Sequence, residues 1–203
     1  MISPDKPAGA GAYARLVRAA SGWRALAIAF TWAMMEASLF FVVPDVWLGF
    51  VALYAPRRML ATLLATVLGA VAGGALLYLV TPLLGDTLSG WLVHLPGIGA
   101  TDLVRARAEL ARQGIAAFLN GPLQGLPVKL YIHVGALDGL GLPGALLGVA
   151  LNRLERIGVF GLVMALVGVI GRPVIARWPR AVLLVYVTAW VMFYAAYWGT
   201  TGP

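Results

Sequence analysis

The sequence predicts an all-α integral membrane protein. We expect an inverted repeat of two re-entrant helical hairpins, each followed by a transmembrane helix, and a further transmembrane helix at the C-terminus. Three observations predict this class. Hydrophobic residues make up 61% of the 203-residue chain and charged residues only 11%, whereas about a quarter of residues are charged in soluble domains. The mean hydropathy is +0.88. Long apolar segments are interrupted by prolines, and the two halves of the chain repeat the same order of features.

The charge balance limits the partners and cofactors that we expect. The formal charge is +7, which in a membrane protein is typical of basic cytoplasmic loops and suits anionic lipid or phosphate. The basic residues form no continuous stripe, so nucleic acid is not an expected partner. The chain has no cysteine and only two histidines. This excludes thiolate metal sites and argues against a histidine site, so we expect neither metal nor cofactor.

The first predicted unit is an N-terminal tail followed by an interfacial basic helix, within residues 1–24. Its helical part carries Arg15, Arg18 and Arg24 and is expected either to lie on the membrane surface or to be a plain positively charged flank. The apolar segment that follows, 25–43, is longer than a signal peptide core and lacks a small-residue cleavage site. We therefore interpret it as retained structure.

Residues 25–58 are predicted to form the first re-entrant hairpin. Its first helix carries Glu36 and ends at Pro44, which cannot continue a helix. The second apolar piece, 46–55, is too short to cross a bilayer, which needs about 20 residues. Arginines flank both outer ends, so both ends are expected on one side of the membrane. A broken backbone at membrane depth is tolerated only inside protein or beside a cavity.

The clearest predicted transmembrane helix is 59–82. Small residues recur four apart along it, as at Gly69 and Gly73, a spacing that permits close helix packing within the chain or in a homodimer. The helix is predicted to end at Pro82, and residues 83–100 are predicted to be a loop.

Residues 101–143 are predicted to form the second re-entrant hairpin. It begins as an amphipathic helix in which Arg105 and Glu109 are an i,i+4 pair. We expect breaks at Asn120-Gly121-Pro122 and again at 138–143. Two transmembrane helices complete the chain, at 144–171 and 181–199.

The two halves, 12–82 and 101–171, share one outline and would have opposite orientations. Inverted repeats of broken helices are a recurring plan of transporters, with the site at the repeat interface. This topology places the arginines that follow residue 171 in the cytoplasm, as the positive-inside rule prefers. It places the arginines of 101–119 outside, which the rule does not prefer.

The candidate substrate site lies within Asn120–Arg156. Lys129 follows Pro127 at a helix start, where free N–H groups and the helix dipole favour phosphate. His133 is four residues further along. Arg153 and Arg156 share one helix face and suit bidentate contacts with phosphate. The alternatives are arginines that snorkel to the membrane surface and a histidine that is simply buried.

Glu36 and Asp45 are the acidic counterparts of these cations. A carboxylate inside a membrane binds a proton more readily than one in water. One hypothesis is therefore that the two acids couple phosphate movement to protons. The alternative is a structural ion pair with Lys129 or an arginine. Both require Glu36 and Asp45 to lie near Lys129, Arg153 or Arg156 in a cavity.

A set of motifs extends over about residues 30–165: Glu36, Pro44-Asp45, ALYAPRR (52–58), Gly69, Gly73, Gly74, Tyr78, Gly85, GLPVK (125–129), Gly135 and the arginines of NRLER. These motifs resemble the DedA family, part of the VTT or SNARE-associated membrane proteins, and most closely its small YqaA-like branch. Asp45 stands where many members have glutamate, and Gly74 stands where aspartate is common.

The resemblance implies a function that hydropathy does not show. Members are thought to be lipid transporters with re-entrant hairpins, including carriers that return undecaprenyl phosphate across the bacterial inner membrane. It implies a multi-pass bacterial inner-membrane flippase or scramblase for an anionic phospho-lipid, with Lys129, Arg153 and Arg156 binding phosphate. His133 is atypical of the family at its position and is a candidate phosphate ligand only by its spacing from Lys129. The alternatives are a transporter of small solutes or ions and a membrane assembly protein without transport. An enzyme is not expected, because no nucleophile or metal set accompanies the cations.

Overall fold

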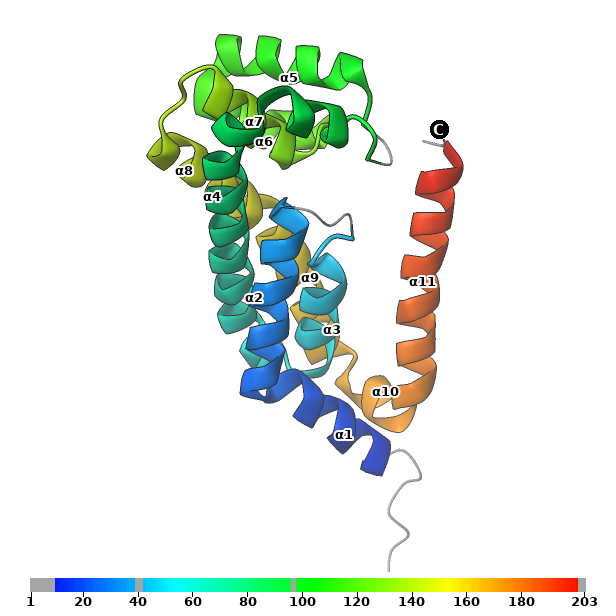
Figure 1. Cartoon of the computed structure of the whole chain (residues 1–203). Helices are drawn as coiled ribbons and strands as arrows, with labels where there is room; N and C mark the ends of the chain where they lie inside the picture. The colour runs from blue at the N-terminus through cyan, green and yellow to red at the C-terminus, as the bar shows by residue number, and fades with distance from the viewer. Residues whose placement is uncertain (1–9, 39–41, 96–97, 201–203) are drawn as a thin grey trace, which may run out of the picture.

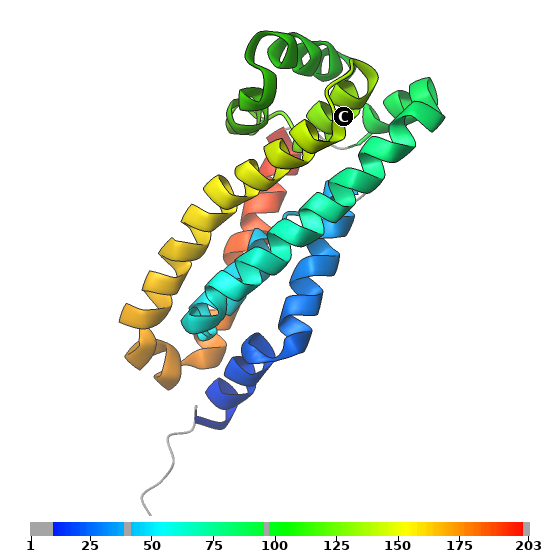
Figure 2. The same ribbon diagram turned by 90° about the vertical axis from the view of Figure 1, so that its left-hand side faces the viewer.

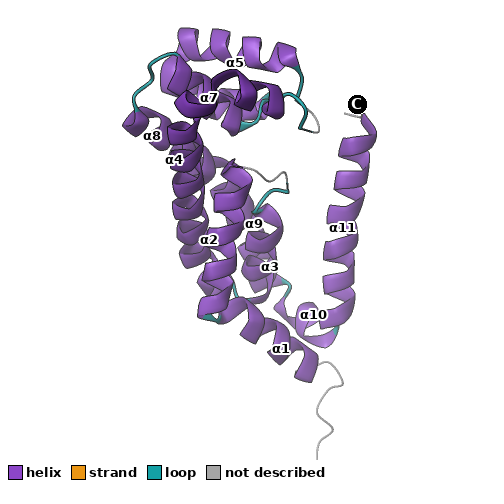
Figure 3. Ribbon diagram, in the orientation of Figure 1, coloured by secondary structure: helices purple, strands orange, loops and turns teal. Residues whose placement is uncertain are grey.

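The computed structural model describes residues 10–38, 42–95 and 98–200. Most of the predicted polar tail and part of the first hairpin turn lie outside these ranges. The described residues form helices and loops and contain no strand, as Figure 3 shows. This confirms the all-α class.

The N-terminal part consists of a surface helix and a helical hairpin. Helix α1 (Ala10–Ser21) leads into α2 (Trp23–Ser38), and α3 (Asp45–Tyr54) returns beside it. The outer ends of α2 and α3 lie at the same end of the molecule, next to α1 (Figure 1). The sequence placed these helices to within a few residues, because Pro44 and Pro56 interrupt the apolar pattern at both ends of α3.

The long helix α4 (Met59–Leu92) follows a short turn of 3₁₀-helix, η1 (Pro56–Arg58). The predicted loop at 83–100 is therefore wrong over most of its length. Pro82 lies inside the helix, and the kink occurs at Gly85, whose φ of 45° suits a residue without a side chain. Leu88 and Leu92 are buried beyond the kink, so apolar packing continues the helix where proline alone predicted an end.

Small residues bring α2 and α4 into close contact. A Cβ atom added at Gly69 would overlap the carbonyl of Phe30, and one at Gly73 would overlap the carbonyl of Met34. On the α2 side a row of alanines four residues apart is buried: Ala25, Ala29, Ala33 and Ala37. The predicted role of the small-residue spacing in close helix packing is confirmed, and its partner is α2 of the same chain.

The second half begins with three short helical segments and the turn between two of them. These are α5 (Ala100–Gln113), η2 (Gly114–Ala116), α6 (Ala117–Leu123) and α7 (Val128–Leu137). The break predicted at Asn120-Gly121-Pro122 is wrong, because α6 runs through it. The chain turns instead at Gly114 (φ 55°) and Gly125 (φ 90°). Tyr131 fills the space beside Gly121, so that glycine makes room for a side chain.

A second long helix runs back along the molecule in three consecutive parts. It consists of α8 (Leu142–Asn152), the π-helical turn η3 (Arg153–Ile157) and α9 (Gly158–Ile170). The predicted break over 138–143 is confirmed, with Gly139 at φ 85°. The π turn was not predicted. Such turns are rare and occur often at functional sites, and this one contains both arginines of the candidate site.

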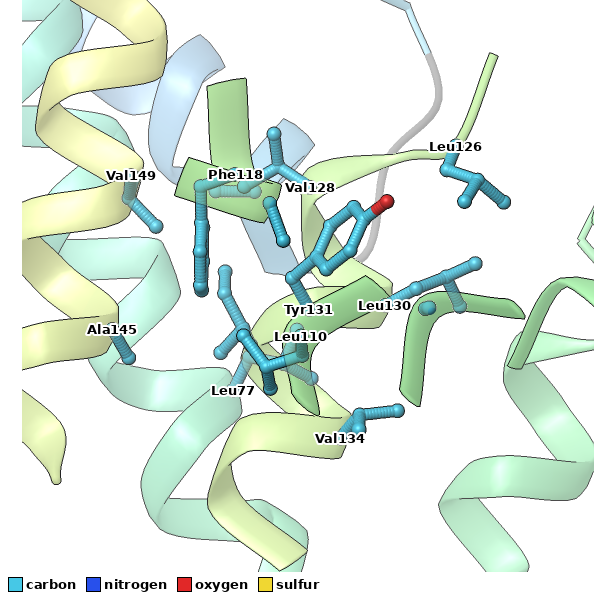
Figure 4. Packing of buried hydrophobic residues seen from close by; sticks show 14 of the residues in the cluster. Leu77, Leu110, Phe118, Leu126, Val128, Leu130, Tyr131, Val134, Ala145 and Val149 are labelled. Atoms are coloured by element: carbon cyan, nitrogen blue, oxygen red, sulfur yellow. The ribbon is translucent and has the colours of Figure 1, made fainter. Parts of the chain in front are cut away.

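The two halves pack reciprocally. Their long helices, α4 and α8–α9, run side by side along the molecule (Figure 2). Helix α3 packs on α9, and α7 packs on α4. Around α7 the core is closely filled (Figure 4), with Phe118, Leu130, Tyr131 and Val149 fully buried. The second helix of each hairpin thus packs on the long helix of the other half.

The chain ends with α10 (Arg172–Arg177) and α11 (Pro179–Thr200). Two helices, Pro56–Leu92 and Pro179–Tyr197, are long and apolar enough to cross a membrane. The 18-residue apolar stretch within Pro179–Tyr197 has no residue buried in the protein. Helix α9 also exposes an apolar face, formed by Val159, Leu162, Leu166, Val169 and Ile170.

Candidate functional site

A cavity of about 190 Å³ lies where the two hairpins, the π turn and α11 meet. Glu36 and Val43 come from the first hairpin, and the second supplies Pro122 and the segment Gly125–Lys129. The π turn contributes Arg153 and Arg156, preceded by Asn152 at the end of α8. The last wall is aromatic and belongs to α11: Phe193, Tyr194 and Tyr197.

Two ion pairs join the first hairpin to the π turn. Arg153 donates a hydrogen bond from Nη2 to Oε2 of Glu36, and both side chains are almost fully buried. Nη2 of Arg156 lies 3.6 Å from Oδ2 of Asp45. The sequence predicted that these acids would lie near the basic residues, and the structure brings all four together.

Lys129 lies on the second hairpin and lines the same cavity. It is the second residue of α7, directly after the extended backbone of Pro127. Only 4% of its surface is exposed. The proline ends the preceding turn and starts the helix, as the sequence predicted, and so fixes where the lysine enters the protein.

Several polar atoms of the cavity lack partners among the described residues. These are Nε of Arg153, Nε of Arg156 and Oδ1 of Asn152, all of them buried. An unpaired buried donor or acceptor costs about 1–3 kcal/mol, and more when it is charged. Such atoms are therefore candidates for contact with a ligand.

The charges around the cavity do not cancel locally. Lys129, Arg153 and Arg156 line it together with one carboxylate, that of Glu36. Asp45 pairs with Arg156 from outside the lining. The remaining positive charge, with free guanidinium N–H groups, suits an anion that accepts several hydrogen bonds.

Helix α11 is tied to the first hairpin through tyrosine hydroxyls. The hydroxyl of Tyr194 accepts a hydrogen bond of 2.9 Å from the backbone N–H of Val43. Closer to the start of α11, Tyr186 donates one of 2.7 Å to the carbonyl of Val46. Sequence reasoning interpreted the aromatic residues of α11 as a membrane-interface cluster and missed the place of Tyr194 and Tyr197 on the cavity wall. Their spacing of three residues was the available signal, because it puts them on one helix face.

The structure does not bring His133 to the cavity. Its ring is fully buried and lies against α4, with Nε2 2.8 Å from Oγ of Ser89 and Nδ1 3.2 Å from Oγ1 of Thr81. We therefore leave His133 out of the site. Spacing from Lys129 suggested a shared face, but eight consecutive residues of α7 are buried, so sharing a face did not imply sharing a cavity.

Asn152 is a further polar residue of the lining that sequence reasoning did not propose. It is 2% exposed, and its position next to Arg153 was the only available signal. Among the described residues no group of histidine, cysteine and acidic side chains is arranged to hold a metal ion.

Comparison with known proteins identifies no relative. No protein-family model matches the chain, no curated protein matches it, and no solved structure matches its fold. Over the residues that the structure describes, fold and site define a class: an α-helical protein with two helices long and apolar enough to span a membrane and a cavity lined by basic residues. The resemblance to the DedA family stays a prediction from motifs.

Proposed function

We propose that this chain is a multi-pass membrane protein that moves an anionic phospho-lipid, such as a polyprenyl phosphate, across the bilayer of a bacterial inner membrane. One observation carries the proposal. Lys129, Arg153 and Arg156 converge from both halves of the chain on one internal cavity. Basic residues inside an apolar protein are costly and are usually functional.

A membrane location is supported by the surface as well as by the two long helices. Large apolar side chains are exposed along α4, α9 and α11, among them Leu64, Leu68, Leu162, Leu166 and Val191. Soluble monomers rarely expose contiguous apolar surface of this extent. In a bilayer these side chains contact lipid instead of water.

The reciprocal packing of α3 on α9 and α7 on α4 supports an inverted repeat. In this arrangement the hairpins α2–α3 and α6–α7 enter from opposite sides as re-entrant segments. Their broken backbone is then buried in protein and lines a cavity, which is the condition for non-helical backbone at membrane depth.

The size of the cavity supports a headgroup as its occupant. Pockets for drug-sized ligands usually measure about 300–1,000 Å³, so the cavity of about 190 Å³ suits a phosphate and not a whole lipid. The lipid chain would stay in the bilayer. The arginine fork gives bidentate hydrogen bonds to phosphate, and Lys129 adds a second positive charge.

The decisive experiment is headgroup movement in liposomes that contain the purified chain and a fluorescent lipid phosphate. We expect Lys129→Ala and Arg156→Gln to slow movement at least tenfold, whereas Arg112→Gln, at an exposed residue of α5, leaves it unchanged. The idea is wrong if the wild-type chain moves the lipid no faster than empty liposomes. If the wild-type chain moves a soluble anion across the liposome membrane but not the lipid phosphate, transport of small solutes is favoured instead.

A further inference from the structure

Exposed arginines gather at one end of the molecule, outside the cavity. Arg15 and Arg18 lie on α1, Arg24 is the second residue of α2, and Arg57 and Arg58 belong to η1. All five side chains are exposed. These elements lie together at the end where α1 and α10 meet (Figure 1).

The C-terminal part of the chain extends this cluster. Arg172 and Arg177 lie on α10, and Arg180 lies in the first turn of α11. All three are exposed, and α1 contacts both α10 and α11. We call the arginines of this and the preceding paragraph the basic end. No aspartate or glutamate lies on α1, η1, α10 or the first turn of α11, and no described residue forms an ion pair with these arginines.

Two exposed tryptophans accompany the arginines. Trp23 is 74% and Trp178 is 59% exposed. Each ring lies beside an arginine, with Cζ of Arg24 5.9 Å from the Trp23 ring and Cζ of Arg177 5.8 Å from the Trp178 ring. Tryptophan beside arginine is typical of the boundary between headgroups and hydrocarbon.

The opposite end has no comparable excess of positive charge. Arg105 pairs with Glu109 at 3.1 Å, and Arg107 pairs with Asp138 at 2.7 Å. Asp102 caps α5 by accepting a hydrogen bond from the backbone N–H of Gly99. The arginines of α5, which conflicted with the predicted topology, are thus largely neutralised by neighbours.

We propose that the basic end is a docking surface for the anionic headgroups of one membrane leaflet, separate from the transport cavity. It rests on the proposed membrane location but not on transport. Lipid phosphodiesters match it because the charge is spread over several elements on the outer surface, whereas the cavity gathers its three cations around a space of about 190 Å³. By the positive-inside rule the same end faces the cytoplasm.

The test is the thermal unfolding of the full chain in neutral detergent micelles as phosphatidylglycerol is added. We expect Tm to rise by about 3 °C or more, whereas phosphatidylcholine of the same chain length and inorganic phosphate leave it unchanged. Each arginine near an anionic surface contributes about a fivefold preference. The variant Arg15→Gln/Arg18→Gln/Arg177→Gln is therefore expected to weaken the apparent lipid affinity on the order of a hundredfold.

A matched control removes the same number of charges from the other end: Arg105→Gln/Arg107→Gln/Arg112→Gln. We expect it to keep the phosphatidylglycerol response relative to its own baseline. The inference is overturned if both triple variants lose the response equally, or if phosphatidylcholine acts as strongly. If the first triple variant does not fold, Arg57→Gln/Arg58→Gln takes its place and must weaken the response. Loss of the response in Lys129→Ala alone would assign the lipid to the cavity.

These outcomes are independent of the transport assay. A chain that moves lipid phosphate but shows no selective response to phosphatidylglycerol refutes the docking surface alone. A chain that responds but does not move lipid refutes the transport proposal alone.

Discussion

The buried pair of Glu36 and Arg153 gives the sharpest prediction of stability. In Glu36→Gln the glutamate keeps its shape and loses its charge, so Arg153 stays buried without a counterion. Its side chain is only 3% exposed, and Nε already lacks a partner among the described residues. Removing one member of a buried pair costs about 3–5 kcal/mol. For a chain of this size that is a fall in Tm of roughly 6–20 °C.

The double variant Glu36→Leu/Arg153→Met removes both charges and keeps apolar volume. Replacing a whole buried pair by apolar side chains is often neutral or stabilising, so Tm is expected to return close to that of the wild type. The matched control is Glu155→Gln, an exposed acid on the same π turn. Its effect is expected within about 0.5 kcal/mol. Unfolding in micelles, followed by circular dichroism, measures all four proteins.

The same variants separate a structural pair from a functional one. A double variant that regains stability but moves no lipid shows that the pair acts in transport, because folding is then no longer the limit. The reasoning is refuted if Glu36→Gln costs less than about 1 kcal/mol, since a well-hydrated pair would behave in that way.

Three further predictions follow from close contacts. Gly69→Ala lowers stability by about 1–3 kcal/mol, because the added Cβ atom meets the backbone of α2. The control Gly90→Ala, which has open space around it, is neutral or stabilising. Equal shifts in the Tm of the two variants would contradict the close packing of α4 on α2. His133→Ala removes the hydrogen-bond partner of two hydroxyls of α4, so we expect it to lower the free energy of unfolding by about 1–3 kcal/mol. The affinity for lipid phosphate is expected to stay unchanged. A selective loss of that affinity would show that His133 belongs to the binding site. Tyr194→Phe removes the hydrogen bond to Val43, and we expect about 1 kcal/mol of destabilisation with faster labelling of a single cysteine placed on the cavity side of α11.

The prolines and the apolar periodicity predicted much of the fold. Pro44 and Pro56 bound α3, and the spacing of Gly69 and Gly73 predicted a close helix contact. Pro82 wrongly predicted the end of a helix. It lies exposed within α4, and the burial of Leu88 and Leu92 continues the helix beyond it. The helix kinks at Gly85 instead, three residues after Pro82.

The candidate site was predictable as far as charge is informative. Charged residues beside helix breaks are rare in such a sequence, so Glu36, Asp45, Lys129 and the two arginines stood out and proved to be neighbours. Residues with ordinary explanations did not stand out. Aromatic side chains near a chain end fit a membrane interface equally well, and only the packing of α11 assigns Tyr194 to the cavity. For His133 the interpretation went too far. A histidine is unusual in such a sequence and was therefore assigned to phosphate binding, whereas its hydrogen-bonding contacts with α4 explain its presence.

The π turn has a consequence for how this helix tolerates insertions and deletions. A π turn adds one residue to a helix, so the side chains of α8 and α9 lie out of phase by roughly 100°, the angle between successive residues. Gly148 meets Phe118 of the second hairpin, whereas Gly161 and Gly168 meet α3 of the first. One continuous rod thereby presents separate faces to two partners. Deleting Leu154 would rotate the contacts of α8 relative to those of α9 by one residue. We therefore expect the number of residues between Gly148 and Gly161 to tolerate no change, whereas the lengths of the neighbouring loops can change.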